Sequence, residues 1–368
     1  MSSYYCTRRD FLKSLGWGAV SIALPGCMTG SKHVSTGTVK PNIIIVVADD
    51  LGYGDVGVLN QEGKIPTPHL DRLAREGMIF TDAHPGSAVC TPTRYGILTG
   101  RYCWRTQLKK GVLTGYSPHL IEERRMTVAS MLEPFGYHNA CIGKWHLGWD
   151  WQKQKDKPKK VDFTKPILFG PTTNGFDYSF CIPASLDMPP YVKVENDRVT
   201  ALPDRIIEAK TGKKFWRKGL IAADFKHIEV LPKMTEKAVA YIDERRRNNQ
   251  PFFLYFPLPA PHTPILPTRE FQGKSGTNEY GDFVMQVDDT VGQVLESLRR
   301  NGMEDDTLII FTSDNGCSPS ADFAELARFG HDPSYVFRGY KADIFEGGHR
   351  IPFLARWPGK IKSGSICK

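Results

Sequence analysis

Cys90 begins a run of residues whose types could carry out covalent chemistry. The run continues through Pro92 and Arg94 to Tyr102. A cysteine can act as a nucleophile, but a covalent nucleophile must form an intermediate and then be released from it. The alternative is that Cys90 is a small buried apolar residue, which is the commonest role of a free cysteine. A catalytic role for Cys90 therefore requires other reactive groups to lie near it.

Acidic and amide side chains follow two apolar segments of the chain. Asp49 and Asp50 come directly after one β-branched run, and Asp314 and Asn315 come after another. Carboxylate and amide oxygens suit Ca²⁺ or Mg²⁺ and disfavour zinc, which prefers His and Cys. The alternative is that each pair only caps a turn. Because both pairs accompany Cys90, we predict that these four residues bind a divalent metal.

An alternation of apolar strands and amphipathic helices is expected to position these groups. Strands are predicted over 42–48, 78–81, 137–142, 252–257 and 307–312. A helix is predicted over 280–300, and Thr67 and Pro68 provide the N-cap and first turn of another that runs to Glu76. This order indicates an α/β fold with a large, mostly parallel sheet between layers of helices. Ligands bind such sheets beyond the carboxyl ends of the strands, where the polar clusters fall.

The run from Cys90 to Tyr102 resembles the signature of type I sulfatases, which belong to the alkaline phosphatase superfamily. In that family the cysteine of Cys-x-Pro-x-Arg is oxidised to an aldehyde, formylglycine (3-oxoalanine), whose hydrate attacks sulfur. One hydroxyl takes the sulfuryl group, and the other expels sulfate and regenerates the aldehyde. The resemblance implies that a formylglycine-generating maturase converts Cys90 and that Arg94 holds the product.

The same resemblance implies roles for the metal ligands and for four cationic side chains. The positions that match Asp49, Asp50, Asp314 and Asn315 bind one Ca²⁺ or Mg²⁺, which also touches the formylglycine at Cys90. The cationic positions are Lys144, His146, His262 and Lys341. Both lysines would bind sulfate, one histidine would be the base for the second hydroxyl, and the other would help to protonate the leaving alcohol. A dianion-like transition state would neutralise their mutual repulsion.

Lys144 and His146 are separated by one residue just past a predicted strand. In an extended segment this spacing places both side chains on one face. Family resemblance makes Lys144 a ligand of the nucleophile and of sulfate, and His146 the base. His262 would assist the leaving alcohol, and Lys341 would bind sulfate and assist in the same departure.

The resemblance extends from residue 41 to about 362, and the chain ends at Lys368. Family members usually continue into another helix and strand and a small antiparallel carboxyl-terminal domain. We therefore expect residues 41–368 to be a sulfatase catalytic domain that is incomplete at its carboxyl-terminal end. The small domain is expected to be missing or incomplete.

The amino terminus has the pattern of a bacterial export signal. Thr7 to Lys13 contains a twin-arginine motif, and a short apolar run follows it. Leu24 to Cys27 resembles a lipobox whose cysteine would be lipidated, although Pro25 departs from the usual residue and leaves release as the alternative. Residues 1–27 are thus predicted to be a signal peptide read by the twin-arginine export machinery. The protein would be periplasmic or a membrane-anchored lipoprotein, with a linker over 28–40.

These patterns predict an exported sulfatase that hydrolyses sulfate esters by S–O cleavage, acting on a sulfated sugar or an aryl sulfate. One alternative is a phosphodiester or phosphonate monoester hydrolase of the same superfamily. Another is a truncated, inactive fragment that at most binds sulfated glycans. The chain has 368 residues and a net charge of +8, which suits anionic substrates. Its sequence has no basic and aromatic patches typical of nucleic-acid binding.

Some other polar residues receive weaker interpretations. Asp187 and Tyr191 lie in a proline-rich segment and are candidates for substrate specificity. Structural roles are expected for four histidines, which are His69, His84, His138 and His349.

Overall fold

The computed structural model describes residues 5–6, 40–248 and 250–368. The predicted lipobox cysteine Cys27, the twin-arginine motif and most of the 28–40 linker lie outside the described residues. Tyr5–Cys6 forms a short strand, β1, that pairs in parallel with β13 (Ser365–Cys367). Within the described residues, no helix has the combination of length and apolarity needed to span a membrane.

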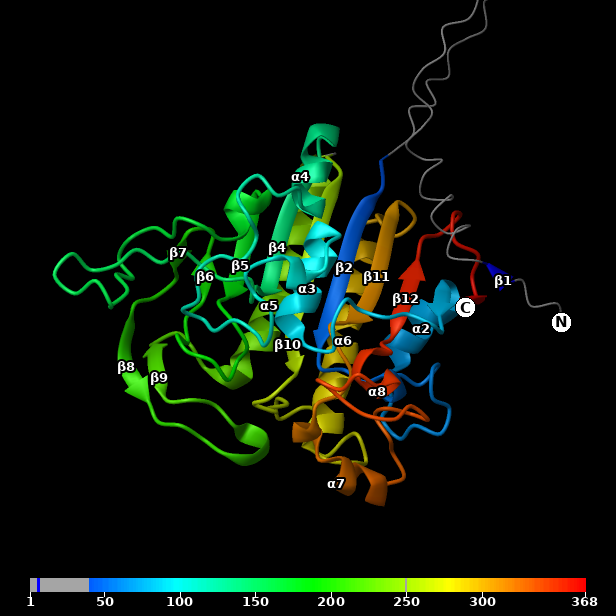
Figure 1. Cartoon of the computed structure of the whole chain (residues 1–368). Coiled ribbons are helices and arrows are strands. Elements are labelled where there is room, and N and C mark those ends of the chain that lie inside the picture. Colours follow the sequence, from blue (N-terminus) through cyan, green and yellow to red (C-terminus); the bar gives the residue numbers. More distant parts are fainter. Residues whose placement is uncertain (1–4, 7–39, 249) are drawn as a thin grey trace, which may run out of the picture.

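A large mixed sheet forms the centre of the molecule (Figure 1). In the described residues it has eleven strands in the order β1-β13-β3-β12-β11-β2-β10-β4-β5-β6-β7. The strands between the two ends already given are β3 (Met78–Phe80), β12 (Phe353–Arg356), β11 (Thr307–Ser313), β2 (Asn42–Asp49), β10 (Phe252–Pro261), β4 (His138–Lys144), β5 (Tyr178–Ile182), β6 (Val194–Glu195) and β7 (Arg198–Val199). The five strands from β11 to β5 run parallel to one another. β12 is antiparallel to β11, and β6 is antiparallel to β5. This confirms the predicted α/β fold with a mostly parallel sheet.

Helices pack on both faces of this sheet. The longest, α5 (Val230–Arg245) and α6 (Glu279–Arg300), contact each other and β10, and α3 (Cys90–Thr99) lies on the opposite face (Figure 1). The other α-helices are α2 (Pro68–Glu76), α4 (Val128–Leu132), α7 (Phe323–Arg328) and α8 (Glu346–His349). A separate two-stranded sheet consists of β8 (Pro203–Ile207) and β9 (Gly219–Ala222).

The central strands are apolar along their whole length because both of their faces are covered. Every residue of β10 is buried, and β2 consists of Ile, Val and Ala between Asn42 and Asp49. The predicted strands and helices all occur, with ends that differ by a few residues. β10 is longer than predicted and continues to Pro261, which brings the next residue, His262, to the edge of the sheet.

The start of α2 is capped differently from the prediction. Thr67 occupies the N-cap position, but its hydroxyl accepts a hydrogen bond from Gly57 N (2.9 Å) instead of capping the helix. Asp288 of α6 provides the cap, because its carboxylate accepts hydrogen bonds from the backbone of His69 (3.2 Å) and Leu70 (2.8 Å). Burial raises the pKa of Asp288 to about 7 despite these two donors.

Replacing Asp288 with asparagine should change how stability depends on pH. The folded-state pKa lies above the unfolded value of about 3.9, so the folded protein holds this proton more tightly. The contribution of Asp288 to stability is therefore fully present below about pH 4 and is lost as the pH rises through 7. An asparagine side chain keeps a carbonyl acceptor and has no such proton. We expect the melting temperature of the Asp288→Asn variant, measured relative to wild type, to rise between pH 5 and pH 8; a constant difference would contradict this.

Candidate active site

The predicted oxygen ligands meet at the carboxyl ends of two adjacent strands. Asp49 is the last residue of β2, and Asp314 directly follows β11, which pairs with β2 up to Ser313. Asp50 N donates to Asp314 Oδ1 (3.2 Å), and Asn315 Nδ2 donates to Asp50 Oδ1 (2.7 Å). All four ligand candidates are buried. The parallel pairing of β2 and β11 therefore brings together residues more than 260 positions apart.

Cys90 is the first residue of α3 and is buried beside this cluster. Its thiol occupies the position that the formylglycine aldehyde would take after conversion. Burial raises the pKa of Cys90, although the charges of Lys144 and Lys341 oppose the increase. The encoded thiol is therefore protonated and a poor nucleophile, since thiolates are the reactive form of cysteine.

Arg94 lies one turn after Cys90, and its hydrogen bonds go to a predicted metal ligand. Its Nη2 and Nε donate to Asp314 Oδ2 at 2.6 and 2.9 Å, and Nη1 donates to the carbonyl of Lys144 (3.2 Å). Its guanidinium is fully buried. The resemblance implies that Arg94 holds the nucleophile, and these contacts show that it also positions Asp314 and the end of β4.

The two predicted sulfate-binding lysines reach the cluster from different segments. Lys144 Nζ lies 2.7 Å from Asp49 Oδ2, and Lys341 Nζ lies 2.7 Å from Asp50 Oδ1. Burial would raise the pKa of Asp49, but the surrounding charges, above all that of Lys144, hold it well below its usual range. The pKa of Lys341 is raised because Asp50 and its neighbours outweigh the effect of burial. Both lysines form ion pairs with carboxylates of the cluster and face the same site.

His146 has a backbone conformation that the sequence did not predict. Its φ is 55°, so the segment after β4 is not extended there, and the expected same-face arrangement of Lys144 and His146 does not explain their convergence. His146 Nε2 lies 2.7 Å from the carbonyl of Leu113 and must carry the proton of that hydrogen bond. Nδ1 is buried without a partner among the described residues and keeps its lone pair. Burial, together with the charge of Lys144, lowers the pKa of His146 well below its usual value and keeps the ring neutral.

His262 carries its proton on the other ring nitrogen from that of His146. Its Nδ1 lies 2.5 Å from the carbonyl of Thr263, so Nδ1 carries a proton. Its Nε2 lies 3.6 Å from Asp50 Oδ2. Ligand atoms of His262, Asp49 and Asp50 all lie within 4.8 Å of one another. The hydrogen bond from Nδ1 therefore fixes the ring so that Nε2 faces the centre of the cluster.

The cluster fits a hard divalent cation. Asp49 Oδ1 and Asn315 Oδ1 are buried acceptors without a hydrogen-bond partner among the described residues. Buried polar atoms are normally satisfied, so two unsatisfied oxygens in one cluster indicate a ligand that accepts their lone pairs. With Asp50 and Asp314 they supply only oxygen atoms, which matches Ca²⁺ or Mg²⁺.

Two groups that position the site could not be inferred from the sequence. The Leu113 carbonyl fixes the tautomer of His146, and a backbone carbonyl carries no sequence signal. Tyr280 of α6 contacts Asp55 (2.5 Å) and lies 3.2 Å from the carbonyl of Asp50. The position of Tyr280 in the helical pattern of α6 marks it only as a core residue.

The two candidates for substrate specificity lie in the segment that follows β5. Tyr191 is buried, and its hydroxyl already bonds the carbonyls of Asp187 (3.0 Å) and Arg217 (2.6 Å). Asp187 forms an ion pair with Arg217, and its Oδ1 has no hydrogen-bond partner among the described residues. Asp187 thus remains a candidate for substrate contact, whereas Tyr191 has a structural role. The Nδ1 atom of His138 bonds the Tyr241 hydroxyl (2.9 Å), as expected for a structural histidine.

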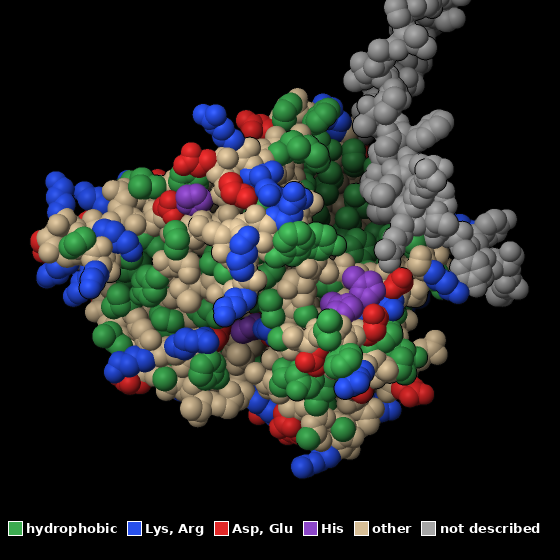
Figure 2. Space-filling view, viewed as in Figure 1, with side chains coloured by type: hydrophobic (Ala, Val, Ile, Leu, Met, Phe, Trp, Pro, Cys, Tyr) green, Lys and Arg blue, Asp and Glu red, His purple; other side chains and the backbone are tan. Residues whose placement is uncertain are grey.

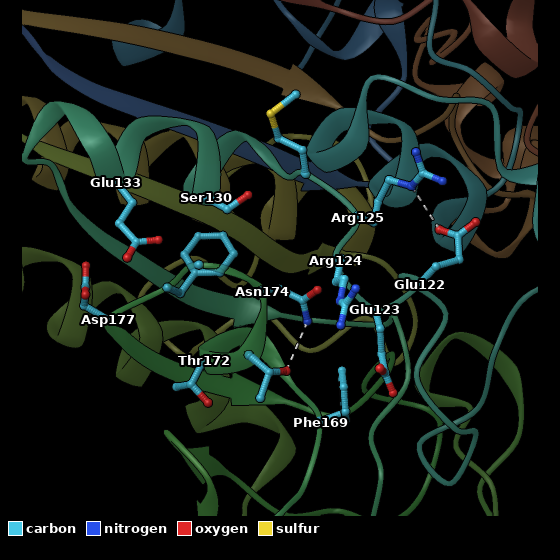
Figure 3. Close-up of a pocket in the computed structure, with 14 residues that line it drawn as sticks. Glu122, Glu123, Arg124, Arg125, Ser130, Glu133, Phe169, Thr172, Asn174 and Asp177 are labelled. Carbon is cyan, nitrogen blue, oxygen red and sulfur yellow. Dashed lines mark hydrogen bonds and ion pairs between the residues drawn. The ribbon is translucent and has the colours of Figure 1, made fainter.

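A separate surface pocket of about 650 Å³ lies beside α4 (Figure 3). Its lining includes Glu122, Arg125, Phe169, Asn174 and Asp177. Two of its charged groups, Arg125 and Glu122, pair with each other at 3.4 Å. None of the predicted catalytic or metal-binding residues lines this pocket, so it is not the predicted active site.

The mostly parallel sheet, together with buried carboxylates, an amide, two lysines and two histidines around Cys90, defines the alkaline phosphatase-like class of α/β hydrolases. The family model described as Sulfatase matches residues 41–366. The chain therefore belongs to the sulfatase family, whose members are sulfuric ester hydrolases.

Individual relatives agree with this family. The chain is 36% identical over 361 residues to the N-acetylgalactosamine-6-O-sulfatase of Bacteroides thetaiotaomicron, covering 88% of this chain and 68% of that protein. It is 32% identical to the N-acetylgalactosamine-6-sulfatase of Mus musculus, covering 89% of this chain but 59% of the mouse protein. A structure solved in work on glycosaminoglycan metabolism by Bacteroides thetaiotaomicron superimposes with a TM-score of 0.78 at 36% identity, covering 90% of this chain and 74% of that one.

Proposed function

We propose that this protein hydrolyses sulfate esters of sugars by S–O cleavage, with Cys90 converted to formylglycine and a divalent cation bound by the oxygen cluster. The observation that carries the proposal is the convergence of Lys144, His146, His262 and Lys341 on buried carboxylates beside Cys90. Such a site is electrostatically complementary to a sulfate ester and to the additional charge of its transition state.

Two groups outside the encoded chain would complete this site. A cation held by Asp49, Asp50, Asp314 and Asn315 would polarise the sulfuryl group. A hydrated aldehyde at Cys90 would supply one hydroxyl to attack sulfur and a second to release sulfate. The rest of the chemistry falls to the side chains of the chain itself.

The side chains divide the work of binding and proton transfer. Lys144 and Lys341 would bind sulfate oxygens, because the Nζ atoms of both point into the cluster. Nε2 of His262 faces Asp50, and when it carries a proton it could protonate the leaving alcohol oxygen as the S–O bond breaks. His146 presents a bare Nδ1 and can take the proton whose loss allows sulfate to depart.

Replacing His146 with alanine should lower kcat for a sulfate ester by about 10²- to 10⁴-fold, the usual range for a general base, and the sulfated enzyme should accumulate because His146 serves the step after S–O cleavage. Because the pKa of His146 lies well below its usual value, protonation of His146 should not lower the wild-type rate as the pH falls through 6.5. The matched control is His138→Gln, at the far end of the strand that leads to His146, which should retain wild-type activity. A His146→Ala variant with normal kcat, no accumulation of sulfated enzyme and intact conversion of Cys90 would exclude His146 as the base.

The sulfate position is proposed from the relatives. Two of them are named for the 6-sulfate of N-acetylgalactosamine, and we propose a 6-sulfated N-acetylhexosamine as the substrate class. A panel of monosaccharides sulfated at O2, O3, O4 or O6 would test this, with desulfation followed by released sulfate. Preference for another position would reject the substrate class but not the sulfatase activity.

Mass spectrometry of the tryptic peptide that contains Cys90, after co-expression with a formylglycine-generating enzyme, is the direct test of the proposal. The mass of the aldehyde or its hydrate is expected. An unmodified thiol, in cells that convert a control sulfatase, would favour the inactive-fragment alternative. Turnover of an aryl phosphodiester faster than an aryl sulfate would instead favour the phosphodiesterase alternative.

We also propose export by the twin-arginine machinery, with Cys27 as the site of lipidation. Twin-arginine export normally carries folded cargo, so conversion of Cys90 would precede export. Cys27→Ser should abolish labelling by radioactive palmitate and release the protein from the membrane fraction. Labelling that persists in the variant would reject a lipid anchor at Cys27.

A further inference from the structure

We propose that His84, His349 and Glu346 form a second metal site, which binds a transition-metal dication of the Zn²⁺ type. One ligand atom of each residue lies within 4.8 Å of the others. Figure 2 shows histidine side chains gathered beside acidic ones at one place on the surface. The site is separate from the oxygen cluster, and it does not rest on the proposed function.

Hydrogen bonds fix the proton on each of the two imidazole rings. His349 Nε2 lies 2.8 Å from the carbonyl of Ile344, and a carbonyl can only accept. His84 Nε2 lies 2.9 Å from a carboxylate oxygen of Asp82, which also accepts. Each neutral ring therefore carries its hydrogen on Nε2. Nδ1 keeps a lone pair in both rings.

These two bare nitrogens face each other. His84 Nδ1 and His349 Nδ1 are 2.8 Å apart, a distance at which two lone pairs repel unless a cation lies between them. Bonds of about 2.0–2.1 Å to one tetrahedral Zn²⁺ would require a separation of about 3.4 Å. An opening of about 0.6 Å is within the reach of side-chain rotation, because the histidine side chain at position 84 is about one-third exposed.

The surroundings match those of metal-binding histidines. Such histidines almost always donate their second N–H to a carboxylate or a backbone carbonyl, which fixes the ring and the tautomer. His84 has the first arrangement and His349 has the second. Two imidazoles and a carboxylate also form a typical ligand set for zinc with an open position for water. Glu346 is 41% exposed, its Oε2 lies 4.0 Å from Nε2 of His84 and also pairs with Arg350, so its side chain would have to turn toward the two Nδ1 atoms to bind the metal.

The local charge attracts a cation. Asp82 and Glu346 contribute two negative charges, and Arg350, which pairs with both, contributes one positive charge. With both histidines neutral, the cluster has a net charge of −1. A dication would change this net charge to a positive one. The Ca²⁺ or Mg²⁺ of the oxygen cluster is not expected here, because the ligands are mainly nitrogen.

The proposed metal would link two segments that carry active-site residues. His84 precedes Cys90 by six positions, and α8, with both other ligands, follows Lys341. Two backbone hydrogen bonds already join these segments, Ala342 N to the carbonyl of Ala88 (2.9 Å) and Ile351 N to that of Ala83 (3.1 Å). A metal bridge would hold the segment before Cys90 against the segment after Lys341.

The test uses the full chain after removal of metals, with Ca²⁺ kept in excess to occupy the oxygen cluster. Zn²⁺ is titrated in competition with a chromophoric chelator, and Co²⁺ is used as a spectroscopic probe. We expect one Zn²⁺ per chain, a visible Co²⁺ spectrum typical of four-coordination, and slower hydrogen exchange in residues 82–89 and 342–350. His84→Ala and His349→Ala should each weaken Zn²⁺ binding at least about 10- to 100-fold.

The matched control is His119→Gln. His119 also pairs with a carboxylate, Asp150 Oδ2 at 2.7 Å, but no second imidazole faces it among the described residues. Zn²⁺ binding should be unchanged in this variant, and melting curves in chelator would show that all variants fold. Zn²⁺ binding that is equal in wild type and His84→Ala would overturn the proposal. So would the absence of stoichiometric binding, which would mean that the two histidines only share a proton.

Discussion

Cys90→Ala is expected to reduce kcat for a sulfate ester by at least about 10⁴-fold, because it removes the only covalent nucleophile that the proposed mechanism contains. Alanine fills most of the volume of the buried cysteine at the start of α3, so the fold should persist. Turnover of a fluorogenic aryl sulfate and a thermal melt, measured on the same preparation, check both statements.

The control for this variant is Cys103→Ala. Cys103 is also buried and lies soon after α3, but it contacts Thr106 and Leu108 instead of the cationic cluster. The activity of the control variant should equal that of wild type. If Cys90→Ala retained a substantial part of the wild-type rate, water would have to attack sulfur directly, and the formylglycine proposal would fail.

Asp50→Asn is expected to remove the bound divalent cation and to lower kcat/KM by about 10³-fold or more. Asp50 lies 2.7 Å from Lys341 Nζ and 3.6 Å from His262 Nε2, and it accepts a hydrogen bond from Asn315. Loss of its charge leaves the buried end of Lys341 without a counter-ion, which should also destabilise the fold by about 3 kcal/mol. Metal content by mass spectrometry and the melting temperature measure the two effects.

Asparagine is the appropriate replacement because Asp50 has a φ of 65°, a conformation that Asn tolerates better than most residues. The matched control is Asp322→Asn, because Asp322 has a φ of 64° and caps α7 through Glu325 N. This variant should keep its metal and its activity. Wild-type metal content in Asp50→Asn would exclude Asp50 from the ligand set and would leave the catalytic roles of the lysines and histidines untouched.

The sheet could be predicted because its strands are apolar on both faces. The runs that became β2, β10 and β11 admit few alternatives, since they are too short for typical helices and too apolar for exposed strands. Parallel strands also place their carboxyl ends at one edge, so Asp49 and Asp314 could be expected to meet before any coordinates existed.

The partners of individual polar groups could not be predicted. Thr67 occupies the expected N-cap position of α2, yet Asp288, from a helix more than 200 residues away, accepts the capping hydrogen bonds. Arg94 follows Cys90 by one helical turn, yet it holds Asp314. Local sequence limits which groups can form hydrogen bonds, but the choice among acceptors depends on packing between distant elements.

The sequence alone determined the fold class, the family and the set of residues around Cys90, because these depend on apolar periodicity and on contiguous motifs. Only the tertiary structure decided the protonation of the histidines, since each tautomer depends on which backbone carbonyl the folded chain turns toward the ring: that of Leu113 for His146 and that of Thr263 for His262. The pairing of His84 with His349 likewise depends on the fold. Their rings are separated by 265 positions and meet only because the segments before Cys90 and after Lys341 pack together.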